Sequence, residues 1–181
     1  MKLFFLLITF SASLFSTNIN ESLLSIHATL VPKISLLDIN FAEKLDNNAI
    51  TIVLYYDNSN YNSAKLLKQK IMSKYKNGLK EHPINVKLTP YSKPEKLKAN
   101  ISYLFPSTRT NIKKILKNLH ESETLSFSYS IADLALGSMI SLDIGVKVKP
   151  IINLHAIKDN NISLHPILLK ISTIYQNKRV D

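Results

Sequence analysis

The middle of the chain alternates between short apolar runs and longer amphipathic segments. The run ITIVLYY at residues 50–56 is almost unbroken and predicts a strand buried on both faces. Residues 61–76 instead repeat apolar side chains at helical spacing, with lysines on the other faces, which predicts an amphipathic helix. The same two patterns recur, so strands are also predicted over 84–89, 101–105 and 124–129, and a second helix over 111–119.

The two ends of the chain follow other patterns. Apolar residues at helical spacing predict a helix over residues 21–38, which Pro32 should kink or divide. In the last third, residues 139–144 and 146–154 alternate between apolar and polar positions on either side of Gly145. This alternation predicts a hairpin or a bulged strand pair.

The last third also contains two prolines that limit its structure. Pro150 should place the second hairpin strand near an edge of the sheet or a break in the ladder. Pro166 suits the first position of a closing helix. We expect that helix to turn four apolar side chains inward: Ile167, Leu168, Ile171 and Ile174.

The alternation of strands and helices predicts an α/β fold, because strand–helix–strand units form crossovers between parallel neighbours. We expect one domain with a mixed, largely parallel sheet, helices on both faces, and a C-terminal antiparallel hairpin plus helix. The segment before this pattern differs from it. Lys2 precedes the apolar run LFFLLITF and a group of small polar residues, as in a secretory signal peptide. We therefore expect a signal peptide at residues 1–16, an α/β domain at 17–181 and export from the cytoplasm, with an uncleaved N-terminal anchor as the alternative.

Charge and composition narrow the choice of partners. The formal net charge is +10, yet only Arg109 and Arg179 are arginines and the lysines are spread along the chain. Base recognition favours arginine, and nucleic-acid grooves interleave basic with aromatic side chains, so we expect no nucleic-acid partner. A weak attraction to an anionic membrane surface stays open. The chain contains no cysteine, which excludes disulfides, thiolate zinc sites and cysteine nucleophiles.

The sequence offers no recognisable catalytic or metal-binding motif. The five histidines show no metal-binding spacing, although His155 and His165 flank a turn and could meet in space. Three glycines are too few and too scattered for a phosphate-binding loop. We therefore expect no catalytic residues, no metal and no cofactor, and interpret the protein as a binding protein rather than an enzyme.

Polar side chains that follow the predicted strands are the candidates for binding. Ligands of open α/β sheets gather outside the carboxyl ends of the strands. Ser107 and Thr108 follow one predicted strand there, Ser130 follows another, and Asp57 follows the first. The alternative interpretation is helix capping and turn formation, which these residue types perform in most proteins.

The C-terminal third resembles the closing segment of the YfiR-like periplasmic proteins. The matching residues, 137–172, read GSMISLDIGVKVKPIINLHAIKDNNISLHPILLKIS. They include an Ile-Asn-Leu step around Asn153, which joins the candidate binding residues because its amide could hydrogen-bond a ligand or satisfy a turn. The segments SYLFPST at 102–108 and LSFSYSIAD at 125–133 are also similar to that family.

This resemblance implies a periplasmic regulator without catalysis. Such a protein would bind the exported part of an inner-membrane signalling protein, a diguanylate cyclase or a sensor kinase, and would lower cyclic-di-GMP and biofilm formation. A small-molecule ligand and a homodimer are further expectations from the resemblance. The alternative is a small solute-binding protein that delivers a ligand to a transporter or receptor.

Overall fold

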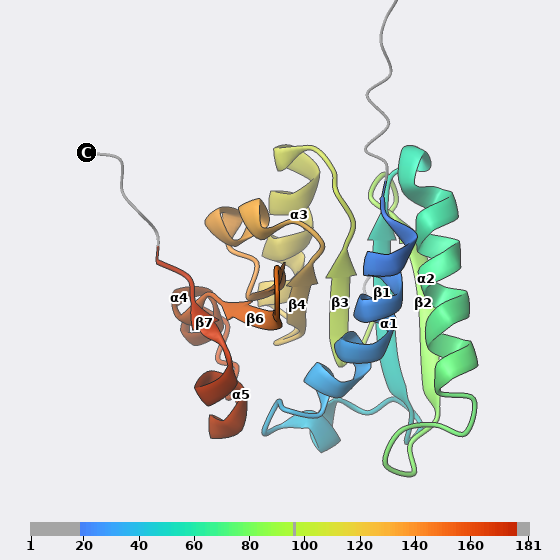
Figure 1. Ribbon diagram of the computed structural model, residues 1–181, viewed down its shortest axis with the longest axis horizontal. Helices are drawn as coiled ribbons and strands as arrows, with labels where there is room; N and C mark the ends of the chain where they lie inside the picture. The colour runs from blue at the N-terminus through green and yellow to red at the C-terminus, as the bar shows by residue number, and fades with distance from the viewer. Residues whose placement is uncertain (1–18, 96, 177–181) are drawn as a thin grey trace, which may run out of the picture.

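A seven-stranded sheet runs through the computed structural model, which describes residues 19–95 and 97–176 (Figure 1). The expected signal peptide at residues 1–16 lies outside this described part. The strands lie in the order β2-β1-β3-β4-β5-β6-β7. Their bounds are β1 Ile50–Tyr56, β2 Ile84–Pro90, β3 Ile101–Leu104, β4 Leu125–Ser128, β5 Ile140–Ile144, β6 Val148–Ile152 and β7 Thr173–Ile174.

Most neighbouring strands in this sheet are parallel. β1 pairs in parallel with β2 and β3, and β3, β4 and β5 continue the parallel series. β5 and β6 then form an antiparallel hairpin, and β7 lies parallel to β6. These pairings confirm the predicted α/β fold. β1 is buried at its first six positions, because it lies inside a sheet that is covered on both faces.

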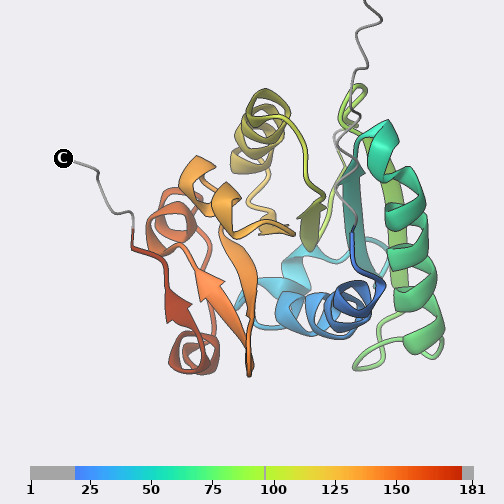
Figure 2. The same ribbon diagram turned by 45° about the horizontal axis from the view of Figure 1, so that its top comes forward.

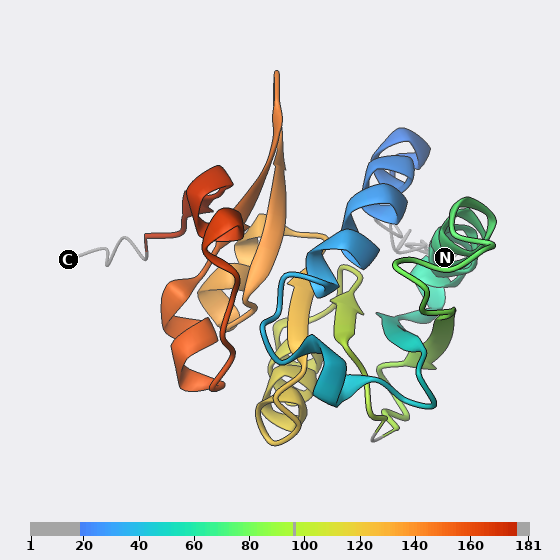
Figure 3. The same cartoon turned by 90° about the horizontal axis from the view of Figure 1, so that it is seen from below.

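Helices cover both faces of the sheet, as the view from below shows (Figure 3). α1 (Glu21–Ser35) and α2 (Tyr61–Lys74) pack on one face and enclose the larger apolar core. α3 (Arg109–His120) packs on the opposite face. Its buried side chains are those that the helical spacing predicts to face inward, namely Ile112, Ile115 and Leu119.

Short helices complete the connections. Four of them are η1 (Phe41–Lys44), η2 (Asn58–Asn60), α4 (Leu154–Asp159) and α5 (Pro166–Ile171). The fifth, η3 (Ile131–Leu136), ends at Gly137, whose φ of 106° is a left-handed conformation that glycine adopts without strain. Figure 2 shows α4 and α5 beside β6 and β7 at the end of the sheet.

The closing helix is shorter than predicted, and its predicted facing is wrong. α5 ends at Ile171, because Ser172 adopts an extended backbone conformation, and Ile174 belongs to β7. Of the four side chains expected inside, only Leu168 is buried, while Ile167 is 51% and Ile171 53% exposed. A helix of six residues rests on β6 through one inward position, so its other apolar side chains remain in solvent.

Pro32 does not divide the first helix. α1 continues through Pro32 and ends at Ser35. Because Pro32 lies in the last turn of α1, only a short stretch of helix follows the lost backbone donor. No helix within the described ranges, 19–95 and 97–176, has the length and apolar character needed to cross a membrane.

Candidate functional site

The strand order places a topological switch point between β1 and β3. The chain leaves β1 toward β2 on one side and later returns to β3 on the other. In doubly wound sheets of the order 2-1-3-4-5, ligands bind at this point, outside the carboxyl ends of the strands. Asp57 directly follows β1 here, and Ser107 lies in the loop between β3 and α3. Two of the predicted site residues, Ser107 and Thr108, therefore lie at the switch point.

A small hydrogen-bonded cluster joins the two strand ends. The Ser107 hydroxyl donates a short hydrogen bond to the Asp57 carboxylate. Asn111 in the first turn of α3 donates from Nδ2 to Ser107 Oγ at 3.0 Å and to Asp57 Oδ1 at 3.4 Å. The position near the N-terminus of α3 suits a carboxylate, because the helix dipole is positive there. The cluster fixes the geometry of the switch point with groups that could also bind a polar ligand.

A hollow of about 420 Å³ opens beside this cluster. Its lining includes the half-buried Asp57 and the exposed Asn58, Ser59 and Thr108. Thr108 also caps α3, since its hydroxyl accepts the Asn111 N–H at 3.2 Å. Ser107 donates to a carboxylate rather than to an imidazole, so the cluster does not reproduce the proton relay of a serine hydrolase. Hydrogen bonding is the chemistry that these groups offer.

Ser130 lies apart from that cluster and begins η3. Its hydroxyl accepts the Ala132 N–H at 3.3 Å, which is a capping role. The next acidic residue, Asp133, is buried, and burial raises the pKa of its carboxyl to about 6. Tyr91 is also buried, and this burial, together with the charges of Asp133 and Asp57, raises the pKa of its hydroxyl. The carboxyl edge of the sheet therefore contains an acidic group that the sequence pattern did not single out.

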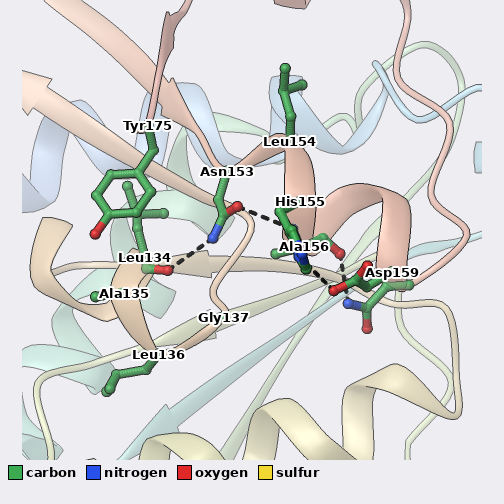
Figure 4. Close-up of a pocket in the computed structure, with 11 residues that line it drawn as sticks. Leu134, Ala135, Leu136, Gly137, Asn153, Leu154, His155, Ala156, Asp159 and Tyr175 are labelled. Carbon is green, nitrogen blue, oxygen red and sulfur yellow. Dashed lines mark hydrogen bonds and ion pairs between the residues drawn. The ribbon is translucent and has the colours of Figure 1, made fainter. Parts of the chain in front are cut away.

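Asn153 lies at a second hollow, which has a volume of about 410 Å³ (Figure 4). Its Nδ2 donates to the Leu134 carbonyl at 2.9 Å, and its Oδ1 accepts the Ala156 N–H at 3.1 Å. The side chain thereby ties η3 to the start of α4. Leu134 and Tyr175 line the hollow on one side of Asn153. Residues of α4, beginning with Leu154, line it on the other side. The structure thus places Asn153 and Thr108 in two different hollows.

The histidines expected near a turn each have a local partner. His155 Nδ1 lies 2.7 Å from Asp159 Oδ2 within α4, and His165 accepts the Ile167 N–H at the start of α5. Across the part of the chain that the structure describes, no three histidine, aspartate or glutamate side chains are grouped as metal ligands.

One further histidine lies in the core. His27 on α1 is 1% exposed, and its Nδ1 lies 2.8 Å from the hydroxyl of Tyr103. The rings of Tyr103 and Phe127 meet it edge-on. Burial lowers the pKa of His27 to about 4, because the charged imidazolium would lose its hydration.

Sequence reasoning missed the partners of the predicted residues. The predicted helix over 111–119 begins at Asn111, and the pattern gives Asn111 no role at the switch point. The contact between Asp57 and Ser107 joins residues far apart in sequence, so it depends on the pairing of β1 with β3. The capping role of Asn153 depends in the same way on the packing of η3 against α4.

These features define the protein as a doubly wound α/β domain with a polar site at the switch point of its sheet. The chain belongs to the YfiR/HmsC-like family, whose model matches residues 35–173. This family comprises periplasmic, non-catalytic regulators of signalling. The resemblance of the C-terminal third is thereby confirmed.

Solved structures support the fold. A conserved domain protein of Vibrio cholerae aligns with a TM-score of 0.60 at 14% identity, over 84% of this chain and 60% of that one. The ABC domain of Streptococcus pneumoniae, in complex with L-Trp, aligns with a TM-score of 0.50 at 13% identity, over 78% of this chain and 60% of that one. The chain thus spans 60% of the length of these two structures. Among curated proteins, no sequence matches the chain.

Proposed function

We propose that the protein is a periplasmic regulator that binds the exported part of an inner-membrane signalling protein, either a diguanylate cyclase or a sensor kinase. Membership of the YfiR/HmsC-like family supports the regulatory class. The exported location rests on the family and on the expected signal peptide. Binding of the regulator would lower the output of its partner, which for a diguanylate cyclase means less cyclic-di-GMP and less biofilm.

The observation that carries this proposal is the distribution of exposed apolar side chains. Of the eleven large hydrophobic side chains exposed among the described residues, eight lie between Ile131 and Ile174. Large exposed apolar patches mark interaction sites. Two of the eight, Ile167 and Ile171, lie on α5, and we call this pair the C-terminal apolar surface.

The C-terminal apolar surface suits a protein partner. α5 contacts β6 through the buried Leu168, so the packing of the fold does not depend on Ile167 or Ile171. These two side chains lie one turn apart on the same face of the helix, where both can enter one partner groove. An interface of ordinary size buries roughly 1,600 Å² in total, of which such anchors would form the centre.

The test combines capture of the partner with a measurement of its output. We expect the tagged protein, cross-linked in intact cells, to capture an inner-membrane diguanylate cyclase or sensor kinase. We expect the double variant Ile167→Asp/Ile171→Asp to lose that capture and to reproduce the signalling output of a gene deletion, because two charges would enter the interface. Met72→Asp is the matched control, since Met72 is exposed on α2, outside the C-terminal apolar surface.

Equal capture by the double variant and the control would contradict this use of the C-terminal apolar surface. Co-purification of transporter subunits alone, with no change in signalling output on deletion, would contradict the regulator itself. Melting curves of both variants provide the folding control, because the substituted side chains are exposed.

A second candidate function is small-solute binding. The hollow beside Asn153, of about 410 Å³, favours it, since small-ligand sites begin at roughly 300 Å³. The hollow at the switch point, lined by Asp57 and Thr108, is of similar size and could take a ligand that tunes the regulator. A ligand retained through purification, together with loss of solute uptake on deletion, would favour the solute-binding alternative. A neighbouring gene for a membrane sensor would favour the regulator.

A further inference from the structure

The β5–β6 hairpin projects from the body of the protein. Ile144 pairs with Val148, so the intervening residues form the turn. Seen from below, the hairpin stands out beyond the neighbouring α1 and α5 (Figure 3). Every residue of the hairpin tip, which we define as Gly145–Lys149, is exposed, and Val146 is fully so. The tip can therefore meet a flat surface before most of the fold does.

The hairpin tip combines apolar and basic side chains in alternation. Val146 and Val148 alternate along the sequence with Lys147 and Lys149, and all four residues are exposed. Neither lysine has an ion pair within the described structure, and Asp143, which lies opposite Lys149 in the register, makes no salt bridge to it. The tip thus presents unpaired positive charge around an apolar side chain in water.

We infer that the hairpin tip binds the surface of an anionic phospholipid bilayer, with Val146 among the headgroups and Lys147 and Lys149 at the lipid phosphates. Charge complementarity carries the inference. Each lysine near an anionic surface contributes attraction of about 1 kcal/mol, and its aliphatic stem can lie along the apolar boundary while its ammonium stays in water. The formal net charge of the whole sequence is +10, of which only Lys2 lies in the expected signal peptide, and this positive charge adds long-range attraction.

A bilayer fits the hairpin tip better than a protein partner does. The tip contains two lysines and no acidic side chain, which suits the uniform negative charge of an anionic bilayer surface. A bilayer needs only a few inserted or phosphate-bound side chains, and other parts of the protein can add to the contact. The inference is independent of the proposed function, because lipid binding needs no signalling partner.

Vesicle flotation with the full mature chain tests the inference. We expect the protein to float with phosphatidylcholine vesicles that contain phosphatidylglycerol, to stay in solution with phosphatidylcholine alone, and to detach in high salt. Lys147→Gln/Lys149→Gln should weaken binding about tenfold or more, from two lysines at about 1 kcal/mol each. Val146→Asp should also weaken binding, because it places a negative charge among anionic lipids.

Matched variants locate the contact. Lys113→Gln/Lys117→Gln removes the same charge from exposed positions on α3 and should leave vesicle binding within about twofold of wild type. Equal losses for both lysine pairs would overturn the inference, because binding would then follow net charge. Binding that does not need phosphatidylglycerol, or no vesicle binding at all, would overturn it too.

The partner-binding variant separates this inference from the proposed function. Ile167→Asp/Ile171→Asp should lose the signalling partner while it retains most of its vesicle binding. The lipid inference would be refuted if the wild-type protein bound no vesicles and a hairpin-tip variant lost the signalling partner. The tip would then be a protein contact.

Discussion

Acidification should reveal how much the buried His27 contributes to the pH dependence of stability. Burial lowers the pKa of this imidazole from 6.5 to about 4 in the folded protein. As the pH falls below 6.5, the unfolded chain takes up a proton that the folded protein does not, so the folded state loses stability. The contribution of the neutral His27 to the free energy of unfolding is therefore fully present above pH 6.5 and is lost progressively as the pH falls to about 4.

The expected loss follows from the size of the pKa shift. A shift from 6.5 to about 4 corresponds to roughly 3 kcal/mol in full, at 1.36 kcal/mol per pH unit. Between pH 7.5 and pH 4.5 most of it, roughly 2.5 kcal/mol, should be lost. Asp133 acts in the opposite sense. Because the pKa of its carboxyl is raised to about 6, the folded state gains stability as the pH falls through that value.

The assay compares wild type with His27→Gln by urea unfolding at several pH values. Both proteins contain Asp133 and the other carboxyl groups, so the difference between their pH profiles isolates His27. We expect the free energy of unfolding of wild type to fall more steeply than that of His27→Gln, by roughly 2.5 kcal/mol over this range. His120→Gln, at an exposed position, should keep the wild-type profile. Parallel profiles for wild type and His27→Gln would refute the reasoning.

Three further outcomes are expected. Ile115→Asp should destabilise the protein by several kcal/mol in thermal melts, because it buries an unpaired charge under α3. Lys113→Asp, at an exposed position, should change the stability by no more than about 0.5 kcal/mol. Similar losses for both variants would refute the predicted orientation of α3. EDTA should leave the melting temperature unchanged, and a decrease that zinc reverses would show a metal site. Mature chains should begin between Leu14 and Asn18, and N-terminal sequencing of the exported protein that finds Lys2 would contradict this.

β1 could be predicted from the sequence because its apolar run is long and unambiguous. The run at residues 50–56 is β1 to the residue, and the helical spacing of Ile112, Ile115 and Leu119 gives the buried face of α3 correctly. These patterns are reliable because the apolar positions of a segment are the ones that the fold buries. The loops at the carboxyl ends of β1 and β3 were also predictable, since turn residues follow each run.

The C-terminal part was less predictable because its helices are short. Apolar spacing from Ile167 to Ile174 resembles one inward helix face, yet the chain turns at Ser172 into a strand that pairs with β6. Periodicity cannot separate a buried face from an exposed apolar face that a partner would cover. The same limit applies to Asn153, whose spacing gives no sign that its amide joins η3 to α4.

Both edges of the sheet are protected against strand addition from another chain. β2 forms one edge, where it exposes Asn85 and Lys87 and ends at Pro90, which has no N–H to donate. β7 forms the other edge and contains only two residues. Charge, proline and short length are the means by which natural sheets avoid edge-to-edge aggregation.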